Sequence, residues 1–150
     1  MTREEQRQQV ICSCIQQQEH IANIAKQEMD SAQQQSNDYG ANVDRYDSYR
    51  TKMMRSRDMY ARQYSNALAG IRALQDLLKM PPFDTVEHGA CVVTDRQKFF
   101  LSIGAGKFMV GNDVYFAISA QTPIYQAVKG HKVGDVFVIN GQSQTIKEIF

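Results

Sequence analysis

The first 80 residues contain no proline and only one glycine before Gly70, which is Gly40. Gln, Ala, Met, Arg and Glu, which favour helix, dominate the sequence on both sides of that glycine. Because proline and glycine are the residues that most often interrupt helices, this stretch predicts two long helices. We expect the chain to turn between them near Gly40, within the sequence SNDYGANVDRYDSYR of residues 36–50.

Apolar and aromatic side chains recur at alternating steps of three and four residues, which is typical of a coiled-coil seam. Nine of eleven positions fit in the second stretch: Val43, Tyr46, Arg50, Met53, Arg57, Tyr60, Tyr64, Ala67, Ile71, Leu74 and Leu78. The first stretch has a weaker series: Ile11, Ile15, Gln18, Ala22, Ala25, Met29 and Ala32. We expect Ile21 and Ile24 to reinforce it. Neither stripe could exclude water alone, which favours an antiparallel hairpin over a parallel dimer interrupted at Gly40.

The composition changes at Pro81 and Pro82, and seven of the nine glycines follow them. The sequences GND (111–113) and NG (140–141) are typical hairpin turns. Six strands are expected: Ala90–Thr94, Phe99–Ile103, Lys107–Val110, Val114–Ile118, Asp135–Ile139 and Gln144–Phe150.

One short helix is expected among these strands, capped by Thr122, beginning at Pro123 and terminated by Gly130. The sequence therefore predicts an α+β fold. A coiled-coil hairpin over residues 1–80 precedes a small β-rich domain over residues 81–150.

The overall charge balance identifies no partner class. The formal charge is +1, from 17 basic and 16 acidic side chains, so no strong net field favours nucleic acid or an anionic membrane. No stretch approaches the roughly 18 apolar residues of a membrane span, and the N-terminal sequence MTREEQRQQ has no apolar core typical of a secretory signal. Three cysteines, few and odd in number, fit a reducing cytoplasm.

Few residues could form an active site within the chain. Cys12, Cys14 and His20 could suggest a metal site, but the two thiols point to different sides of a helix and zinc usually takes four ligands. We expect these thiols to pack as small apolar groups. The sequence GAGK (104–107) lacks the Ser or Thr that follows Lys in a phosphate loop, and is expected to be a hairpin turn. We expect Cys91 to be a buried thiol, and His88 and His131 to lie in surface loops.

Five basic residues lie within thirteen positions of the second helical stretch, opposed there only by Asp58: Arg50, Lys52, Arg55, Arg57 and Arg62. Such a run is usually a solvated helix face. The alternative is a track for a nucleic-acid backbone.

Three aspartates surround the expected turn: Asp38, Asp44 and Asp47. Asp44 and Asp47 are three residues apart, so they share a helix face. If Asn42 caps that helix, the helix dipole stabilises both carboxylates, which is a sufficient structural reason for them. Alternatively, a long arm could deliver these carboxylates into the metal site of another macromolecule, since Mg²⁺ accepts one or two protein carboxylates and completes its shell with water.

Residues 115–150, YFAISAQTPIYQAVKGHKVGDVFVINGQSQTIKEIF, resemble the C-terminal signature of the Gre transcription-elongation factors. In that family an IS…SP…AL.GK.VGD run precedes a final strand ending in I..I. The matching residues are Ile118, Ser119, Pro123, Ala127, Gly130, Lys132, Val133, Gly134, Asp135, Ile146 and Ile149. Thr122 stands at the second serine of the run. With the predicted hairpin, the resemblance covers nearly the whole chain.

The resemblance implies a cytoplasmic factor that is not itself an enzyme. Its FKBP-like C-terminal domain would dock near the rim of the RNA polymerase secondary channel, while the hairpin enters the channel. Acidic tip residues would help the polymerase hold a second Mg²⁺ that generates the nucleophile for cleavage of backtracked RNA. No cofactor is expected on the chain alone. The expected partners are RNA polymerase and the nascent RNA in its channel, with no membrane, and we expect a monomer.

The family's tip motif, GD..ENAEY, aligns with GANVDRYDS, and its glycine falls on Gly40. Asp44 and Asp47 take the positions of its two glutamates, while Ala41 replaces its aspartate, a role that Asp38 could fill. The implied metal-site residues, only in complex with polymerase, are therefore Asp44 and Asp47. The implied channel or RNA contacts are Arg50, Lys52, Arg55 and Arg57, and the implied docking residues are Ser119, Pro123, Lys132 and Asp135.

Two alternatives remain open at this point. A Gre-like regulator could occupy the channel without stimulating cleavage, which fits the alanine at Ala41. A coiled-coil interaction protein unrelated to transcription is the other. Prolyl isomerase activity, which an FKBP-like fold would suggest, is disfavoured because the sequence offers no evident aromatic-lined proline pocket.

Overall fold

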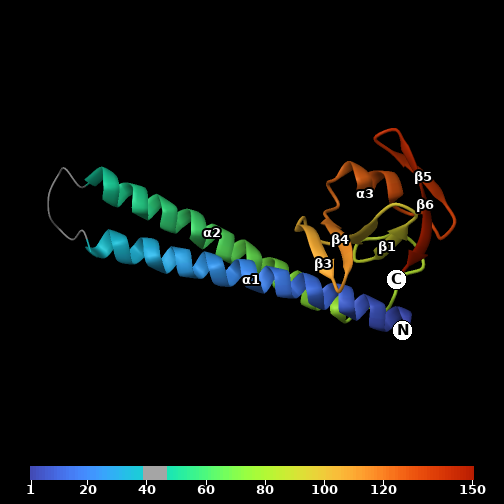
Figure 1. Ribbon diagram of the computed structural model, residues 1–150, viewed down its shortest axis with the longest axis horizontal. Coiled ribbons are helices and arrows are strands. Elements are labelled where there is room, and N and C mark those ends of the chain that lie inside the picture. Colours follow the sequence, from blue (N-terminus) through green and yellow to red (C-terminus); the bar gives the residue numbers. More distant parts are fainter. Residues whose placement is uncertain (39–46) are drawn as a thin grey trace. The chain divides into compact units, whose positions relative to one another are not determined.

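The computed structural model describes residues 1–38 and 47–150. Within them, two long helices precede six strands and one short helix (Figure 1), so the predicted α+β fold class is confirmed. The helices are α1 (Arg3–Asp38), α2 (Asp47–Leu78) and α3 (Pro123–Val128). The strands are β1 (Cys91–Thr94), β2 (Lys98–Leu101), β3 (Gly106–Val110), β4 (Asp113–Ile118), β5 (Val136–Ile139) and β6 (Gln142–Ile149).

The chain forms two compact units. The first, here called the sheet unit, contains Met1–Gln17 and Arg72–Phe150, and thus includes the start of α1 and the end of α2. The second, the hairpin unit, is Gln18–Ile71. A domain boundary at residue 80 stays a prediction, although α2 does end just before Pro81.

The six strands form one mixed sheet in the order β3-β4-β2-β1-β6-β5. Only the β2–β4 pair is parallel; the other neighbours within this sheet are antiparallel. All six expected strands are present, and the turns at 111–112 and 140–141 join β3 to β4 and β5 to β6 as predicted. The expected hairpin at GAGK (104–107) is wrong, because β4 lies between β2 and β3 in the sheet.

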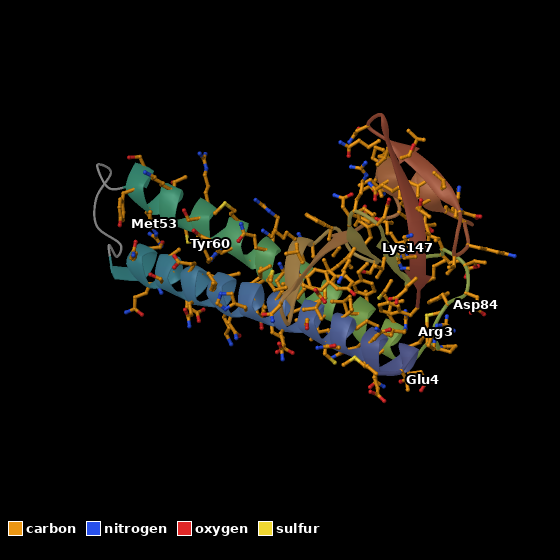
Figure 2. The ribbon with its side chains drawn as sticks, turned by 45° about the vertical axis from the view of Figure 1, so that its right-hand side comes forward. Arg3, Glu4, Met53, Tyr60, Asp84 and Lys147 are labelled. Atoms are coloured by element: carbon orange, nitrogen blue, oxygen red, sulfur yellow. The ribbon has the colours of Figure 1, made fainter. Side chains whose placement is uncertain are left out.

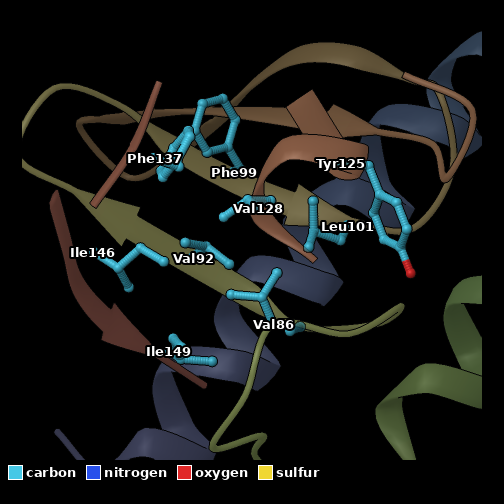
Figure 3. Close-up of a cluster of buried hydrophobic side chains, with 10 residues drawn as sticks. Val86, Val92, Phe99, Leu101, Tyr125, Val128, Phe137, Ile146 and Ile149 are labelled. Carbon is cyan, nitrogen blue, oxygen red and sulfur yellow. The ribbon is translucent and has the colours of Figure 1, made fainter. Parts of the chain in front are cut away.

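Helix α3 begins as the sequence predicted. Thr122 is its N-cap and accepts a hydrogen bond from the Tyr125 main-chain N–H, and Pro123 is in its first turn. Tyr125 and Val128 then turn toward Val92 and Leu101 of the sheet (Figure 3). This face of the sheet forms one apolar core: Val86, Ala90, Val92, Phe99, Leu101, Tyr125, Val128, Phe137, Ile146 and Ile149.

A second core lies on the other face of the sheet. The ring of Phe108 packs against those of Phe100 and Tyr115, with ring centroids 6.4 and 5.9 Å apart. Large apolar side chains are fully buried in the adjoining helix ends too, among them Ile11 and Leu74. The two cores anchor the sheet unit from both sides.

The hairpin unit is held by small side chains. Ala22, Ala25 and Ala32 of the predicted α1 series are buried, and the Tyr49 hydroxyl donates to Gln35 across the antiparallel pair at 3.4 Å. The expectation that Ile21 and Ile24 reinforce this seam is wrong: 39% and 46% of their surfaces are exposed, because they lie off the inward-facing stripe. Val43 and Tyr46 of the α2 series lie outside the described residues.

None of the helices among residues 1–38 and 47–150 is long and apolar enough to cross a membrane.

Candidate macromolecule-binding surfaces

Two of the three acids expected at the hairpin turn are the terminal residues of helices. Helix α1 ends at Asp38 and α2 begins at Asp47. Asp44 lies outside the described residues, as do Gly40 and Ala41, so the predicted tip motif is bounded by the two helices but is itself not described.

The two helical stretches of the hairpin unit carry opposite charge. Residues 18–38 have four acids against one lysine, a net charge of −3, while residues 47–71 have five bases against two acids, a net charge of +3. Within the second stretch, Arg57 pairs with the adjacent Asp58 at 2.7 Å. The hairpin unit therefore has one acidic and one basic helix.

The expected basic track divides into two groups. Lys52 and Arg55 are exposed, and Arg62 shares their helix face because the spacings are three and seven residues. Arg57 instead faces α1, where its guanidinium donates to the Gln33 side chain at 2.6 Å and pairs with Asp58 at 2.7 Å. Arg50 is exposed and lies on the seam series with Arg57.

The four expected docking residues lie before, within and after α3. The Ser119 carbonyl accepts from the Thr122 hydroxyl at 2.9 Å, and Pro123 is exposed in the first turn of α3. The Asp135 carboxylate accepts from the Lys132 main-chain N–H at 2.8 Å, which closes the turn before β5. Ser119 and Asp135 thus shape the local backbone, while the Lys132 side chain and the Pro123 ring face solvent.

Arg7 is a central residue of the sheet unit that the sequence did not reveal. It is 2% exposed, and its guanidinium donates to the carbonyls of Leu77, Met80 and Gly89 at 2.9, 3.3 and 2.5 Å. The guanidinium also lies 5.0 Å from the centre of the Phe83 ring. Burial lowers the pKa of Arg7, and no carboxylate pairs with it among the described residues. Its partners lie 70 or more positions away, so no local pattern predicts this role.

The cysteines do not form a metal centre with their neighbours. No group of three or more His, Cys, Asp or Glu within residues 1–38 and 47–150 could hold a metal ion. Cys12 is exposed, whereas Cys14 and Cys91 are buried, which raises the pKa of each to about 12. The expectation of a buried thiol at Cys91 is confirmed, and His88 lies on the surface as expected, while His131 is half-buried.

A groove of about 320 Å³ lies in the sheet unit beside the start of α1. Arg3, Asp84 and Lys147 line it (Figure 2) together with Val133. Arg3 pairs with Asp84 at 3.1 Å, whereas Lys147 has no ion-pair partner among the described residues.

The chain has a similarity to a known protein in structure but not in sequence. No protein-family model matches the chain, and no curated protein matches it in sequence. Among solved structures, it is similar to the crystal structure of the GreA factor homolog 1 (Gfh1) protein of Thermus thermophilus. The identity is 16%, the alignment covers 91% of this chain and 94% of the other, and the TM-score is 0.35. A likeness at that TM-score supports no conclusion about activity.

Proposed function

We propose that the chain is a Gre-type transcription factor that binds RNA polymerase and inserts its hairpin into the secondary channel. The main support is the signature of residues 115–150, whose Thr122, Pro123 and Asp135 occupy the cap, first turn and turn-closing positions around α3. The same chain carries two long helices, and α1 alone, with 36 residues, corresponds to about 54 Å of helix. A docking domain and a long arm are the two parts that this function requires.

The tip acids would act in the polymerase, not on this chain alone. Asp44 and Asp47, with Asp38 as a substitute for the missing acid at Ala41, would help the polymerase bind a second Mg²⁺. The chain would thus be an accessory factor without an active site of its own. The support is the location of Asp38 at the end of α1 and of Asp47 at the start of α2.

The exposed basic face of α2 would contact RNA or the wall of the channel. Lys52 and Arg55 are its expected residues, and Arg62 extends the same face. Phosphates attract such a row of cations, with a strength that falls as salt rises. Arg57 would contribute mainly by holding α2 to α1 through Gln33.

A regulator that occupies the channel without stimulating cleavage is the second candidate. The observation that favours it is Ala41, which removes an acid from the tip motif. Both candidates bind polymerase, so only the cleavage reaction separates them.

Transcript cleavage in backtracked elongation complexes of the cognate polymerase is the deciding experiment. The wild-type chain should accelerate cleavage, and the variant Asp44→Ala/Asp47→Ala should abolish this while still binding polymerase. The matched control is Glu28→Ala/Asp30→Ala, which removes two exposed acids of α1 away from the turn. Binding without any acceleration by the wild type would favour the second candidate, and absence of binding would rule out both.

A further inference from the structure

The two edges of the sheet are protected to different degrees. At one edge, the Lys107 carbonyl of β3 accepts a hydrogen bond from the Gln17 side chain at 2.9 Å, and Lys107 itself adds an exposed charge. Charged side chains and covering groups are how natural sheets prevent pairing with other chains. At the other edge, β5 has the sequence VFVI, without charge, proline or a register shift. The β5 edge lacks these protections.

Two residues of β5 present unused main-chain groups. The Ile146 N–H donates to the Asp135 carbonyl at 2.9 Å, so Asp135 faces β6 at the start of the hairpin. Because antiparallel pairs alternate, Phe137 and Ile139 also face β6, while the N–H and C=O groups of Val136 and Val138 point outward. Outside the β5–β6 pairing, no residue of the described chain bonds to the main chain of either valine.

The same two residues expose their side chains. Val136 and Val138 are 55% and 59% exposed, and Val133 just before the strand is 57% exposed. Their cross-strand neighbours Thr145 and Ser143 share this face. Lys147 follows on β6 at an irregularity of the β1–β6 pairing, and it is exposed. Val133 and Lys147 also line the groove of about 320 Å³, so the valine face continues into it.

Strand β5 is anchored by the side chains on its buried face. Phe137 is 4% exposed within the apolar core, and Ile139 packs against the same core. The loop residues Asn140 and Gly141 have φ of 51° and 76°, which matches the tight turn that fixes hairpin register. A partner strand would therefore meet a preformed edge and would not have to order it.

We propose that the outer edge of β5 binds an extended segment of a partner protein, which adds to the sheet as a seventh strand. The segment would carry β-branched side chains at alternate positions, to cover Val136 and Val138, and a carboxylate for Lys147. Main-chain hydrogen bonds give affinity in this mode and the alternating side chains give specificity. The β5 edge adjoins Lys132 and Asp135 of the expected docking residues, but the proposal does not depend on the proposed function.

A short segment fits this surface better than a second copy of the chain. A stable protein–protein contact buries about 800 Å² on each partner, which three valines and one four-residue edge do not supply. The free lysine at the end of the valine face also has no acidic counterpart on β5 itself, so two β5 edges would not satisfy it.

A peptide titration of the full, ¹⁵N-labelled chain tests the proposal. The probe is the acetylated, amidated peptide ETVTVTV, and its control is the same peptide methylated on alternate main-chain nitrogens. The amide signals of Val136 and Val138 should shift with the first peptide and not with the second. Val136→Lys/Val138→Lys should weaken binding at least about tenfold, because charge on an edge opposes strand addition.

Met109→Lys is the matched control variant, since Met109 is an exposed apolar residue on the opposite edge strand. It should bind the peptide like the wild type, and Lys147→Gln should bind it a few-fold more weakly. Equal binding of the methylated peptide, shifts confined to another surface, or no binding would overturn the proposal. A wild-type dimer in sedimentation that Val136→Lys/Val138→Lys converts to monomer would also overturn it, because the occupant would then be a second copy.

Discussion

Arg7 and Arg57 both bond across the helical pair, yet they show how differently the two units are held. Arg7 in the sheet unit is buried and bonded to carbonyls from α2 and the segment that follows it. Arg57 in the hairpin unit keeps 31% of its side chain exposed and bonds to an exposed acid and an amide. The sheet unit therefore has a fixed, dry anchor, whereas the hairpin unit relies on contacts that compete with water.

The two units also differ in the size of the side chains that they bury. Fully buried large side chains such as Phe99, Phe100 and Leu74 belong to the sheet unit, while the seam of the hairpin unit is mainly alanine. Small seam residues bury little apolar area, so the hairpin unit should open locally at lower free energy than the sheet unit.

Alkaline pH should affect the sheet unit most strongly. Burial raises the pKa of Cys14 and Cys91 from 9.0 to about 12, so the folded state favours the neutral thiols. Their contribution to stability is complete below pH 9.0 and is lost as the pH rises toward about 12. Denaturant unfolding followed across this range should show a flatter pH dependence in Cys14→Ala/Cys91→Ala. An identical pH dependence would show that the thiols are not the titrating groups.

Removal of the Arg7 guanidinium should cost more than any single change in the hairpin unit. Arg7→Met leaves several buried carbonyls without a donor, and should lower the free energy of unfolding by about 3 kcal/mol or more. Urea denaturation measures this loss. Arg7→Lys should recover part of it, since an ammonium can still donate, and a change below 1 kcal/mol in Arg7→Met would contradict the role of Arg7 as anchor.

A side chain at Gly89 should strain the sheet unit. Its φ is +98°, and a Cβ there would lie 2.9 Å from the Leu77 side chain. Gly89→Ala should destabilise the chain by about 2 kcal/mol, because strain adds to the close contact. Thermal unfolding provides the measurement, and Gly141→Ala is the control, since it has a positive φ but open space around it. Equal losses in the two variants would show that the contact with Leu77 is unimportant.

In the hairpin unit, a glycine in the seam should have a smaller and more local effect. Ala25→Gly should cost about 1 kcal/mol through helix propensity. Hydrogen exchange should report faster opening of residues 18–38 with little change in the sheet strands. If β1 and β6 lost protection to the same extent, the two units would be unfolding together.

The smallest effect is expected at the exposed contact of Arg57. Arg57→Ala should lower stability by less than about 1 kcal/mol, because an exposed ion pair contributes little. Arg62→Ala, on the outer face of the same helix, should be close to neutral. A loss from Arg57→Ala as large as that from Arg7→Met would remove the distinction between the units.

Local patterns predicted much of this fold, and long-range contacts account for what they missed. Turn glycines and alternating side chains located all six strands, and Thr122 with Pro123 located α3. The error at residues 104–107 arose because the parallel β2–β4 pairing joins segments that no turn connects. The role of Arg7 was not predicted because its partners are also distant in sequence. Ile21 and Ile24 were wrongly assigned to the seam because apolar residues next to a seam position have nearly the same spacing.

The candidate sites were predictable to a lesser degree. The basic run was visible in the sequence, but only helix geometry and the Gln33 bond separate Arg57 from Lys52 and Arg55. The open edge at β5 could not be predicted, because it depends on which strand ends the sheet.

The most direct test of the proposed function is to locate the start of α2 while the chain is bound to polymerase. A photo-crosslinking amino acid would replace Ser48, exposed at the start of α2, or Ser143, exposed on β6 as the control. In complexes with the cognate polymerase, the probe at position 48 should crosslink to segments beside the polymerase active centre, and the probe at position 143 should not. Absence of any polymerase crosslink from position 48, in a chain that folds normally, would contradict the proposed function.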